Sequence, residues 1–138
     1  MIDTRILEIQ TTTEFDAIDL TSQVRDAVQE SAIDSGTVTI FFPGTTGAVT
    51  TLDFESGVIA DLRVLLEEFV PREREYQHQR RWKEDHGSAQ LRATILGPSL
   101  TIPFISKMLA LGAWQQIVFI EFDIRPRTSK IIVQIMGE

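Results

Sequence analysis

The chain has 138 residues, a net charge of −7 and no cysteine. This length fits one domain, residues 1–138, and suffices to bury roughly 68% of the surface that the unfolded chain exposes. The lack of cysteine excludes disulfides, thiolate metal sites and a cysteine nucleophile. The acidic balance argues against binding to nucleic acid or an anionic membrane surface, but it permits a local pocket for a small phosphate.

The N-terminal segment has no basic region followed by a long apolar stretch, so it does not resemble a secretion signal. No apolar run in the chain approaches the ~18 residues of a membrane helix. We therefore expect a cytoplasmic protein that has no membrane partner.

The first half of the chain predicts strands from β-branched and aromatic runs and helices from apolar residues at helical spacing. Asp19 or Thr21 is expected to cap the first helix and Ser56 the second, which Pro71 ends. In chain order we expect a strand at 5–10, an extended segment towards 19, a helix from about 20 to 33, strands at 37–42 and 48–52, and a helix from 56 to 70.

The second half begins with an expected long loop, residues 72–87. Ser88 is expected to cap a short helix that ends at a Gly-Pro pair. Strands are expected at 100–104, 114–123 and 130–136, with a turn at 106–112. These segments predict about seven strands, two long helices and one short helix. Because strands do not alternate strictly with helices, the fold class is α+β.

A turn made of Gly44, Thr45, Thr46 and Gly47 follows the first long apolar strand. Its backbone N–H groups and two hydroxyls are suited to an anion. It is not a P-loop, because no Gly-Lys-Ser/Thr follows. The alternative is a plain turn between two strands.

Asp53 and Glu55 lie just before the second predicted helix. In an extended segment, residues two apart lie on one face, where two carboxylates could bind Mg²⁺ or hold a cationic ring. The alternative is that these acids are favoured by the dipole at the start of the helix.

Arg125 and Arg127 flank a proline between the last two predicted strands. The two guanidinium groups suit the oxygens of a phosphate. The alternative is ordinary surface charge on a hairpin.

The only two histidines, His78 and His86, lie in the predicted long loop, and His86 follows Asp85. Imidazole and carboxylate are metal ligands, although a metal site needs several of them held together. The alternative is that both histidines are solvated.

Four motifs in the second half of the chain match those of a known family in sequence and in order. They are LGPSLTIP at 96–103, LGAWQQI at 111–117, FDIRPR at 122–127 and QIMGE at 134–138. On these motifs the chain resembles the YjbQ family, whose members are also called secondary thiamine-phosphate synthase enzymes. The resemblance extends back through residues 76–78 and the threonine turn, and it covers nearly the whole chain.

The resemblance implies a compact mixed β-sandwich with helices, assembled as a homotrimer. It also implies a thiamine-phosphate synthase-like activity, in which a pyrimidine diphosphate and a thiazole phosphate are joined and pyrophosphate is released, with Mg²⁺. In that reaction Asp53 or Glu55 would hold the ion, and Arg127 would stabilise the leaving pyrophosphate. Trp114 would stack a ring or belong to the core. The residues that match the family pattern are Glu55, His78, Asp85, Trp114, Gln115 and Arg127.

The chain also departs from the family pattern, which has histidines where this sequence has Gly44, Ser88 and Gln90. Their loss should weaken a transition-metal site severely, whereas a Mg²⁺ site of carboxylate and phosphate oxygens would suffer less. Two hypotheses follow. One is an enzyme that acts on a phosphorylated ligand, and the other is a non-catalytic ligand-binding protein or structural oligomer.

Overall fold

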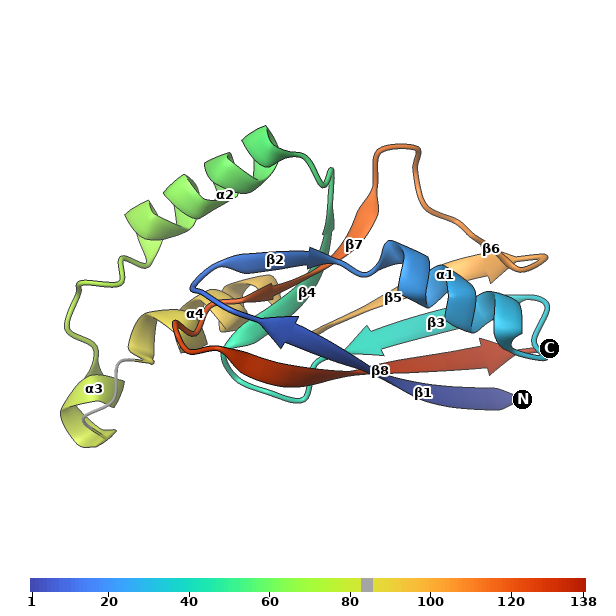
Figure 1. The fold of residues 1–138 in the computed structure, drawn as a ribbon, viewed down its shortest axis with the longest axis horizontal. Coiled ribbons are helices and arrows are strands. Elements are labelled where there is room, and N and C mark those ends of the chain that lie inside the picture. Colours follow the sequence, from blue (N-terminus) through green and yellow to red (C-terminus); the bar gives the residue numbers. More distant parts are fainter. Residues whose placement is uncertain (83–85) are drawn as a thin grey trace.

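Eight strands form two antiparallel sheets in the part of the chain that the computed structural model describes, residues 1–82 and 86–138 (Figure 1). The larger sheet has the strand order β1-β8-β3-β5-β6, and the smaller has the order β2-β7-β4. The strands are β1 (Ile2–Thr11), β2 (Asp16–Asp19), β3 (Gly36–Phe41), β4 (Gly47–Leu52), β5 (Ser99–Ile105), β6 (Met108–Leu109), β7 (Gln116–Glu121) and β8 (Arg127–Gly137).

Four helices accompany these sheets within the described ranges. They are α1 (Thr21–Glu30), α2 (Ser56–Phe69), α3 (Gln77–Trp82) and α4 (Gly87–Leu96). In Figure 1, α4 lies beside β4 and α3 lies farther from the sheets. The apolar side chains of α2, Leu66 among them, pack on the smaller sheet. Two sheets with segregated helices confirm the predicted α+β sandwich class. None of the described helices combines the length and the hydropathy that crossing a membrane requires.

The largest apolar cluster fills the space between the two sheets and beneath α1. The smaller sheet contributes Ile117 and Phe119 to this cluster, and both are fully buried. The alternate residues Val118 and Ile120 belong to a second cluster with side chains of α2 and α4. β7 is therefore buried on both faces, which explains why it reads as a continuous apolar run rather than an alternating one.

The outer face of the larger sheet carries exposed apolar side chains. Ile2 lies opposite Met136 in the β1–β8 register, and Ile6 lies opposite Ile132. Ile2, Ile6 and Met136 are exposed, because the side chains of this face point away from the apolar cluster.

Several predicted boundaries were wrong in the first half of the chain. Glu55, not Ser56, caps α2, because its carboxylate accepts the N–H groups of Gly57 (2.7 Å) and Val58 (2.8 Å). The N-cap position of α1 is Leu20, which makes no side-chain cap, while Asp19 Oδ1 accepts the Thr21 N–H at 2.9 Å. Glu55 thus serves the helix start, as one of the two sequence interpretations stated for this acid.

The predicted loop at 72–87 was also wrong, because it contains α3. No residue of α3 is buried, so the sequence has no apolar periodicity to reveal it. α4 begins at Gly87 after His86, so Ser88 is not its cap. β6 lies within the turn predicted at 106–112, and β8 begins at Arg127, which pairs with Thr11 of β1.

Candidate functional site

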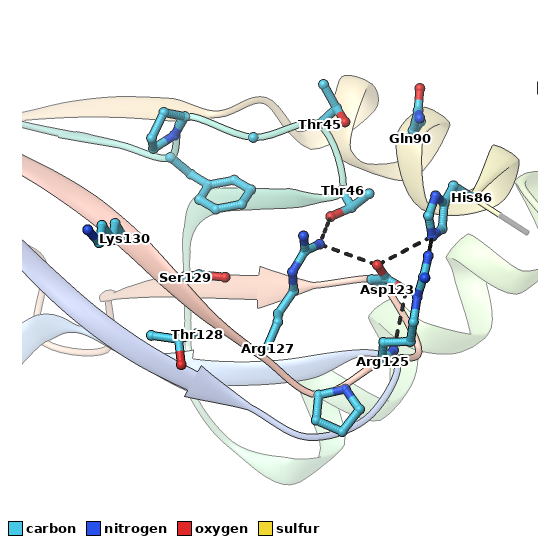
Figure 2. Close-up of a pocket in the computed structure, with 14 residues that line it drawn as sticks. Thr45, Thr46, His86, Gln90, Asp123, Arg125, Arg127, Thr128, Ser129 and Lys130 are labelled. Carbon is cyan, nitrogen blue, oxygen red and sulfur yellow. Dashed lines mark hydrogen bonds and ion pairs between the residues drawn. The ribbon is translucent and has the colours of Figure 1, made fainter. Parts of the chain in front are cut away.

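A cavity of about 690 Å³ lies between the start of β8 and the segment that leaves β3 (Figure 2). Its volume falls within the range of small-molecule sites, roughly 300–1,000 Å³. It is lined by Phe42, Pro43, Gly44, Thr45, Thr46, His86, Gln90, Asp123, Arg125, Pro126, Arg127, Thr128, Ser129 and Lys130.

The cavity exists because β3 is shorter than its neighbour β8. β1 accompanies β8 along 127–136, whereas β3 pairs with it only along 132–137. Two residues beyond the end of β3 is Pro43, which has no N–H to continue the ladder. The chain then turns and enters the other sheet at β4. The first residues of β8 are therefore left beside an open space.

Arg127 projects over a floor of buried carboxylates. Its Nη1 donates to Thr46 Oγ1 at 2.9 Å and to Asp123 Oδ2 at 3.3 Å, and it lies 3.5 Å from Glu121 Oε1. The side chain of Arg127 is 42% exposed, whereas those of Glu121 and Asp123 are 0% and 4% exposed. Buried carboxylates need a hydrogen-bond donor or a cation beside them, and Nη1 of Arg127 supplies both. These contacts fix one end of the guanidinium and leave the rest of it directed towards the cavity.

The two carboxylates are themselves held by backbone amides. Glu121 Oε2 accepts the N–H groups of Phe122 (3.0 Å) and Asp123 (3.2 Å), and Asp123 Oδ1 accepts the N–H of Arg125 (3.3 Å). Neighbouring backbone amides therefore hold both carboxylates in place independently of Arg127. The floor of the cavity is rigid for this reason.

His86 connects α4 to the arginine turn. Its Nε2 contacts Arg125 Nη2 and lies 3.5 Å from Asp123 Oδ2. Arg125 is 65% exposed, so its guanidinium stands at the mouth of the cavity. Figure 2 shows Thr46, Arg127, Asp123, His86 and Arg125 linked in one chain of contacts.

The three positions at which the family pattern has histidine do not share one environment. Gly44 and Gln90 line the cavity, and Gln90 lies one helical turn from His86. Ser88 is buried in α4 and is not part of the lining. Asp85, which the sequence also placed at the site, lies outside the described residues.

The ring of Phe42 occupies the space that a side chain at position 44 would need. A Cβ at Gly44 would lie 2.6 Å from Cε2 of Phe42. Phe42 is buried and packs on Phe119, with ring centroids 4.8 Å apart, so it has little room to move. This packing leaves no space for a larger side chain at position 44.

Ser129 places a hydroxyl at the cavity. The residue is 5% exposed and lines the cavity. Its Oγ makes no hydrogen bond to another residue in the described ranges, and the atom is not fully buried, although the residue as a whole nearly is. A polar atom of this kind is available to a ligand.

The remaining predicted residues lie elsewhere in this single chain. Asp53, Trp114 and Gln115 line a separate hollow of about 410 Å³, and Glu55 is close by in sequence at the start of α2. Trp114 is 77% exposed and so is not a core residue. Gln115 Nε2 donates to Thr51 Oγ1 at 3.1 Å. The sequence-predicted residues thus form two groups.

His78 lies on α3 and is close to the first of these groups. Its ring centroid is 6.3 Å from that of His86. No group of three or more histidine, aspartate or glutamate side chains in the described ranges is arranged to hold a metal ion.

Sequence reasoning missed Glu121 and Asp123, the acids that position Arg127. A signal was present, because both interrupt the apolar run IVFIEFDI at 117–124. A carboxylate in a buried strand requires a cation or hydrogen-bond donors beside it, and the arginines follow within a few residues.

The family model described as UPF0047 protein YjbQ-like matches residues 5–138. The chain belongs to the YjbQ-like UPF0047 family. This match confirms the resemblance that the four motifs indicated. Among curated relatives, the UPF0047 protein of Archaeoglobus fulgidus is 38% identical over 128 residues, which cover 93% of this chain and 97% of the relative. The UPF0047 protein YugU of Bacillus subtilis is 33% identical, with 96% and 98% coverage.

The YjbQ-like chain also shares its fold with solved structures. A YbjQ-like protein of unknown function from Sulfolobus solfataricus P2 superposes with a TM-score of 0.89 at 30% identity, covering 100% of both chains. An uncharacterised YjbQ/UPF0047 family protein from Clostridium acetobutylicum gives a TM-score of 0.88 at 32% identity, covering 96% of this chain and 99% of that one.

Proposed function

We propose that the cavity beside Arg127 binds the phosphate group of a small phosphorylated molecule. The observation that carries this proposal is the anchoring of one guanidinium edge. Every hydrogen bond that the side chain of Arg127 makes within the described chain uses Nη1, so Nε and Nη2 form a free edge. Two parallel N–H groups of arginine match two phosphate oxygens, and such bidentate contacts are among the stronger hydrogen bonds.

The charges around the cavity support an anionic ligand. Arg125, Arg127 and Lys130 line it together with Asp123, while Glu121 lies beneath. The lining thus carries three cationic side chains, against two buried carboxylates that are already engaged, in a chain whose net charge is −7. A local positive excess in an acidic protein concentrates anions at that point.

We propose thiamine-phosphate synthase-like transfer as the activity to test, because the sequence motifs resemble a family with that activity. The arginines would stabilise the pyrophosphate that leaves. Mg²⁺ would come bound to the diphosphate oxygens, which hard cations prefer. The proposal of Asp53 or Glu55 as ion holder requires that a neighbouring copy of the chain bring this group to the Arg127 cavity. This fits the homotrimer that the resemblance implies.

The second candidate is a protein that binds the phosphorylated ligand without converting it. The packing of Phe42 against Gly44 favours this candidate, because it replaces an imidazole position with an apolar ring. Imidazole is the usual proton carrier near neutral pH, and losing it removes a route for general acid–base catalysis.

Calorimetry with inorganic phosphate and with pyrophosphate, with and without Mg²⁺, tests the binding site. Arg125→Gln and Arg127→Gln should weaken pyrophosphate binding by about tenfold each, or ~1.4 kcal/mol. Arg25→Gln is the matched control, because Arg25 is an exposed residue of α1 and its loss changes the net charge equally. Equal affinities for all three variants, with circular dichroism showing intact folds, would overturn the proposal.

Thiamine-phosphate formation by the purified protein separates the two candidate functions. Product that requires Mg²⁺ and is lost in Arg125→Gln supports the enzyme. Pyrophosphate binding without any product supports the non-catalytic protein.

A further inference from the structure

A second hollow, of about 320 Å³, lies between β4, the edge strand of the smaller sheet, and β5 of the larger sheet. It shares no lining residue with the cavity beside Arg127. β5 has a free edge here because β6, its partner on that side, pairs only with Phe104 and Ile105. The Ala110 N–H extends the pairing to Pro103 O at 2.9 Å. The pairing stops there, because a proline has no N–H to donate in return.

The direction of the backbone groups along β5 shows which of them this edge leaves free. The C=O of Pro98 accepts from Phe42, which follows β3, whereas the C=O of Pro103 accepts on the β6 side. Because the direction alternates with every residue, even residues of β5 face β3 and odd residues face the hollow. Ser99 and Thr101 therefore present their N–H and C=O groups to the hollow that they line. No residue in the described ranges bonds to these backbone groups.

The edge of β4 offers the same kinds of group from the opposite wall. The C=O of Thr46 accepts from Phe122, which follows β7, so even residues of β4 face β7. The N–H of Val49 donates to Gly97 O at 3.1 Å on the other side. The N–H and C=O of Thr51 point to that same side, and they have no backbone partner in the part of the chain that the structure describes. Two unpaired strand edges thus face each other across the hollow.

The lining of this hollow carries no ionisable side chain. Its polar groups are the hydroxyls of serine and threonine and the amide of Gln115. Its apolar part includes Leu100 and Leu111, which pack against the largest apolar cluster. A charged ligand group would find no opposite charge here, so the bound group must be neutral. Alternating donors and acceptors beside a small apolar group are the pattern of an extended polypeptide.

The two ends of the hollow limit the length of such a segment. At one end, the hydrogen bond from β4 to Gly97 O brings the two edges together. At the other end, Gln115 donates to Thr51 Oγ1 and accepts the Gly112 N–H, both at 3.1 Å, so both of its amide atoms are engaged. Two steps along an extended strand span about 6.6 Å, so the free edge of β5 accommodates a segment of about three residues.

We propose that this hollow binds an extended, uncharged peptide segment of about three residues, which adds as a strand between β4 and β5. Its central side chain is apolar and lies towards Leu100 and Leu111, and its flanking side chains are polar and lie beside the exposed Thr101. Hydrogen bonds to two strand edges at once compensate for the short length of the segment. The inference goes beyond the proposed function and does not depend on it, because the two sites share no residue.

The probes that test this inference are the blocked peptide N-acetyl-Thr-Val-Thr-amide and the same peptide with an N-methylated valine. Blocking removes both terminal charges. The methyl group removes one donor and lies against one strand edge. The protein should bind the first peptide, and methylation should weaken binding by about tenfold, measured by chemical-shift titration. Equal affinity for both peptides, or no binding of either, overturns the inference and leaves the anion site untouched.

A pair of variants tests the edge of β5. Thr101→Pro removes the N–H that faces the hollow and leaves the ladder to β3 intact, because odd residues of β5 make no ladder bond on that side. It should weaken binding of the unmethylated peptide by about tenfold. Thr101→Ala keeps the N–H and should bind like the wild type. Both variants lose the hydroxyl contact with Thr39, so this contact does not distinguish them.

Amide exchange gives a measurement that needs no substitution. The unmethylated peptide should slow the exchange of the Thr101 or Thr51 amide, and the methylated peptide should not. Unchanged exchange at both amides overturns the inference. Protection of these amides in peptide-free protein that increases with protein concentration also overturns it, because a second copy of the chain would then occupy the hollow.

Discussion

Arg127 and Glu121 form an ion pair at 3.5 Å in which the glutamate is fully buried and the arginine is 42% exposed. The carboxylate lies six residues earlier in the chain, at the end of β7, and the arginine begins β8. The pair therefore couples the smaller sheet to the larger one at the floor of the cavity. A buried carboxylate depends strongly on such a partner, whereas the exposed arginine remains usable by a ligand.

Replacing Arg127 with alanine should destabilise the protein by about 3 kcal/mol, because Glu121 would remain buried without its cation. The double variant Arg127→Ala and Glu121→Gln should recover part of this loss, since the neutral amide costs less to bury. Urea unfolding followed by circular dichroism measures both values. A single variant as stable as the wild type would show that Glu121 does not depend on Arg127.

Gly44→His should destabilise the chain rather than restore a metal site. The new Cβ meets the ring of Phe42, which Phe119 holds in place, and such overpacking costs about 1–3 kcal/mol. Phe42→Leu in the same chain should recover part of the loss, because the smaller side chain opens space beside position 44. Thermal unfolding checks the pair, and zinc titration of the double variant checks for new metal affinity. An unchanged melting temperature for Gly44→His alone would contradict the packing account.

Tyr76 should titrate above its ordinary value. Burial raises the pKa of its phenol from 10.0, and the nearby guanidinium groups of Arg74 and Arg92 offset only part of this effect. The hydroxyl also donates to Pro71 O. The folded state thus favours the neutral phenol, and the resulting stability is fully present below pH 10 and is lost as the pH rises through the raised pKa.

Tyr76 is the only tyrosine in the chain, so ultraviolet absorbance of the phenolate follows it alone. The midpoint should lie above 10 in the folded protein and return to about 10 in urea. Tyr76→Phe should remove this contribution to the loss of stability at high pH. A folded-state midpoint at or below 10 would refute the effect of burial.

We propose that the homotrimer implied by the family resemblance forms through the outer face of the larger sheet. Ile2, Ile6 and Met136 are 60%, 62% and 49% exposed on neighbouring strands, and contiguous apolar surface of this kind marks an interaction site. Sedimentation should give three copies of the 15.6 kDa chain. Ile6→Lys should shift the protein to a monomer, because the interface would then bury an unpaired charge.

Ile95→Lys on α4 is the matched control for this prediction, since Ile95 is 61% exposed but lies away from that sheet. It should leave the assembly intact. A monomeric wild type would contradict the homotrimer, and dissociation by Ile95→Lys alone would move the interface to the helices.

Local sequence patterns predicted those features that neighbouring residues decide. β-Branched runs identified β3 and β4, and helical spacing identified α1 and α2. The arginines and the threonine turn were selected by their chemistry, and both line the cavity. α3 escaped prediction because none of its residues is buried, and Glu55 was mistaken for a residue outside the cap because either it or Ser56 can accept amide hydrogen bonds.

By itself, the sequence determined the α+β class, the family and the residue types from which an anion site can be made. Only the tertiary structure decided which of them meet. It brought Thr46, His86 and Arg127 together with two acids that no motif had marked. It left Glu55 and Trp114 in a different region of the folded chain. The physical reason is that hydrogen-bond patterns and side-chain spacing act over a few residues. The cavity, in contrast, depends on where β3 ends relative to β8, which are far apart in sequence and are aligned only by the packed sheets.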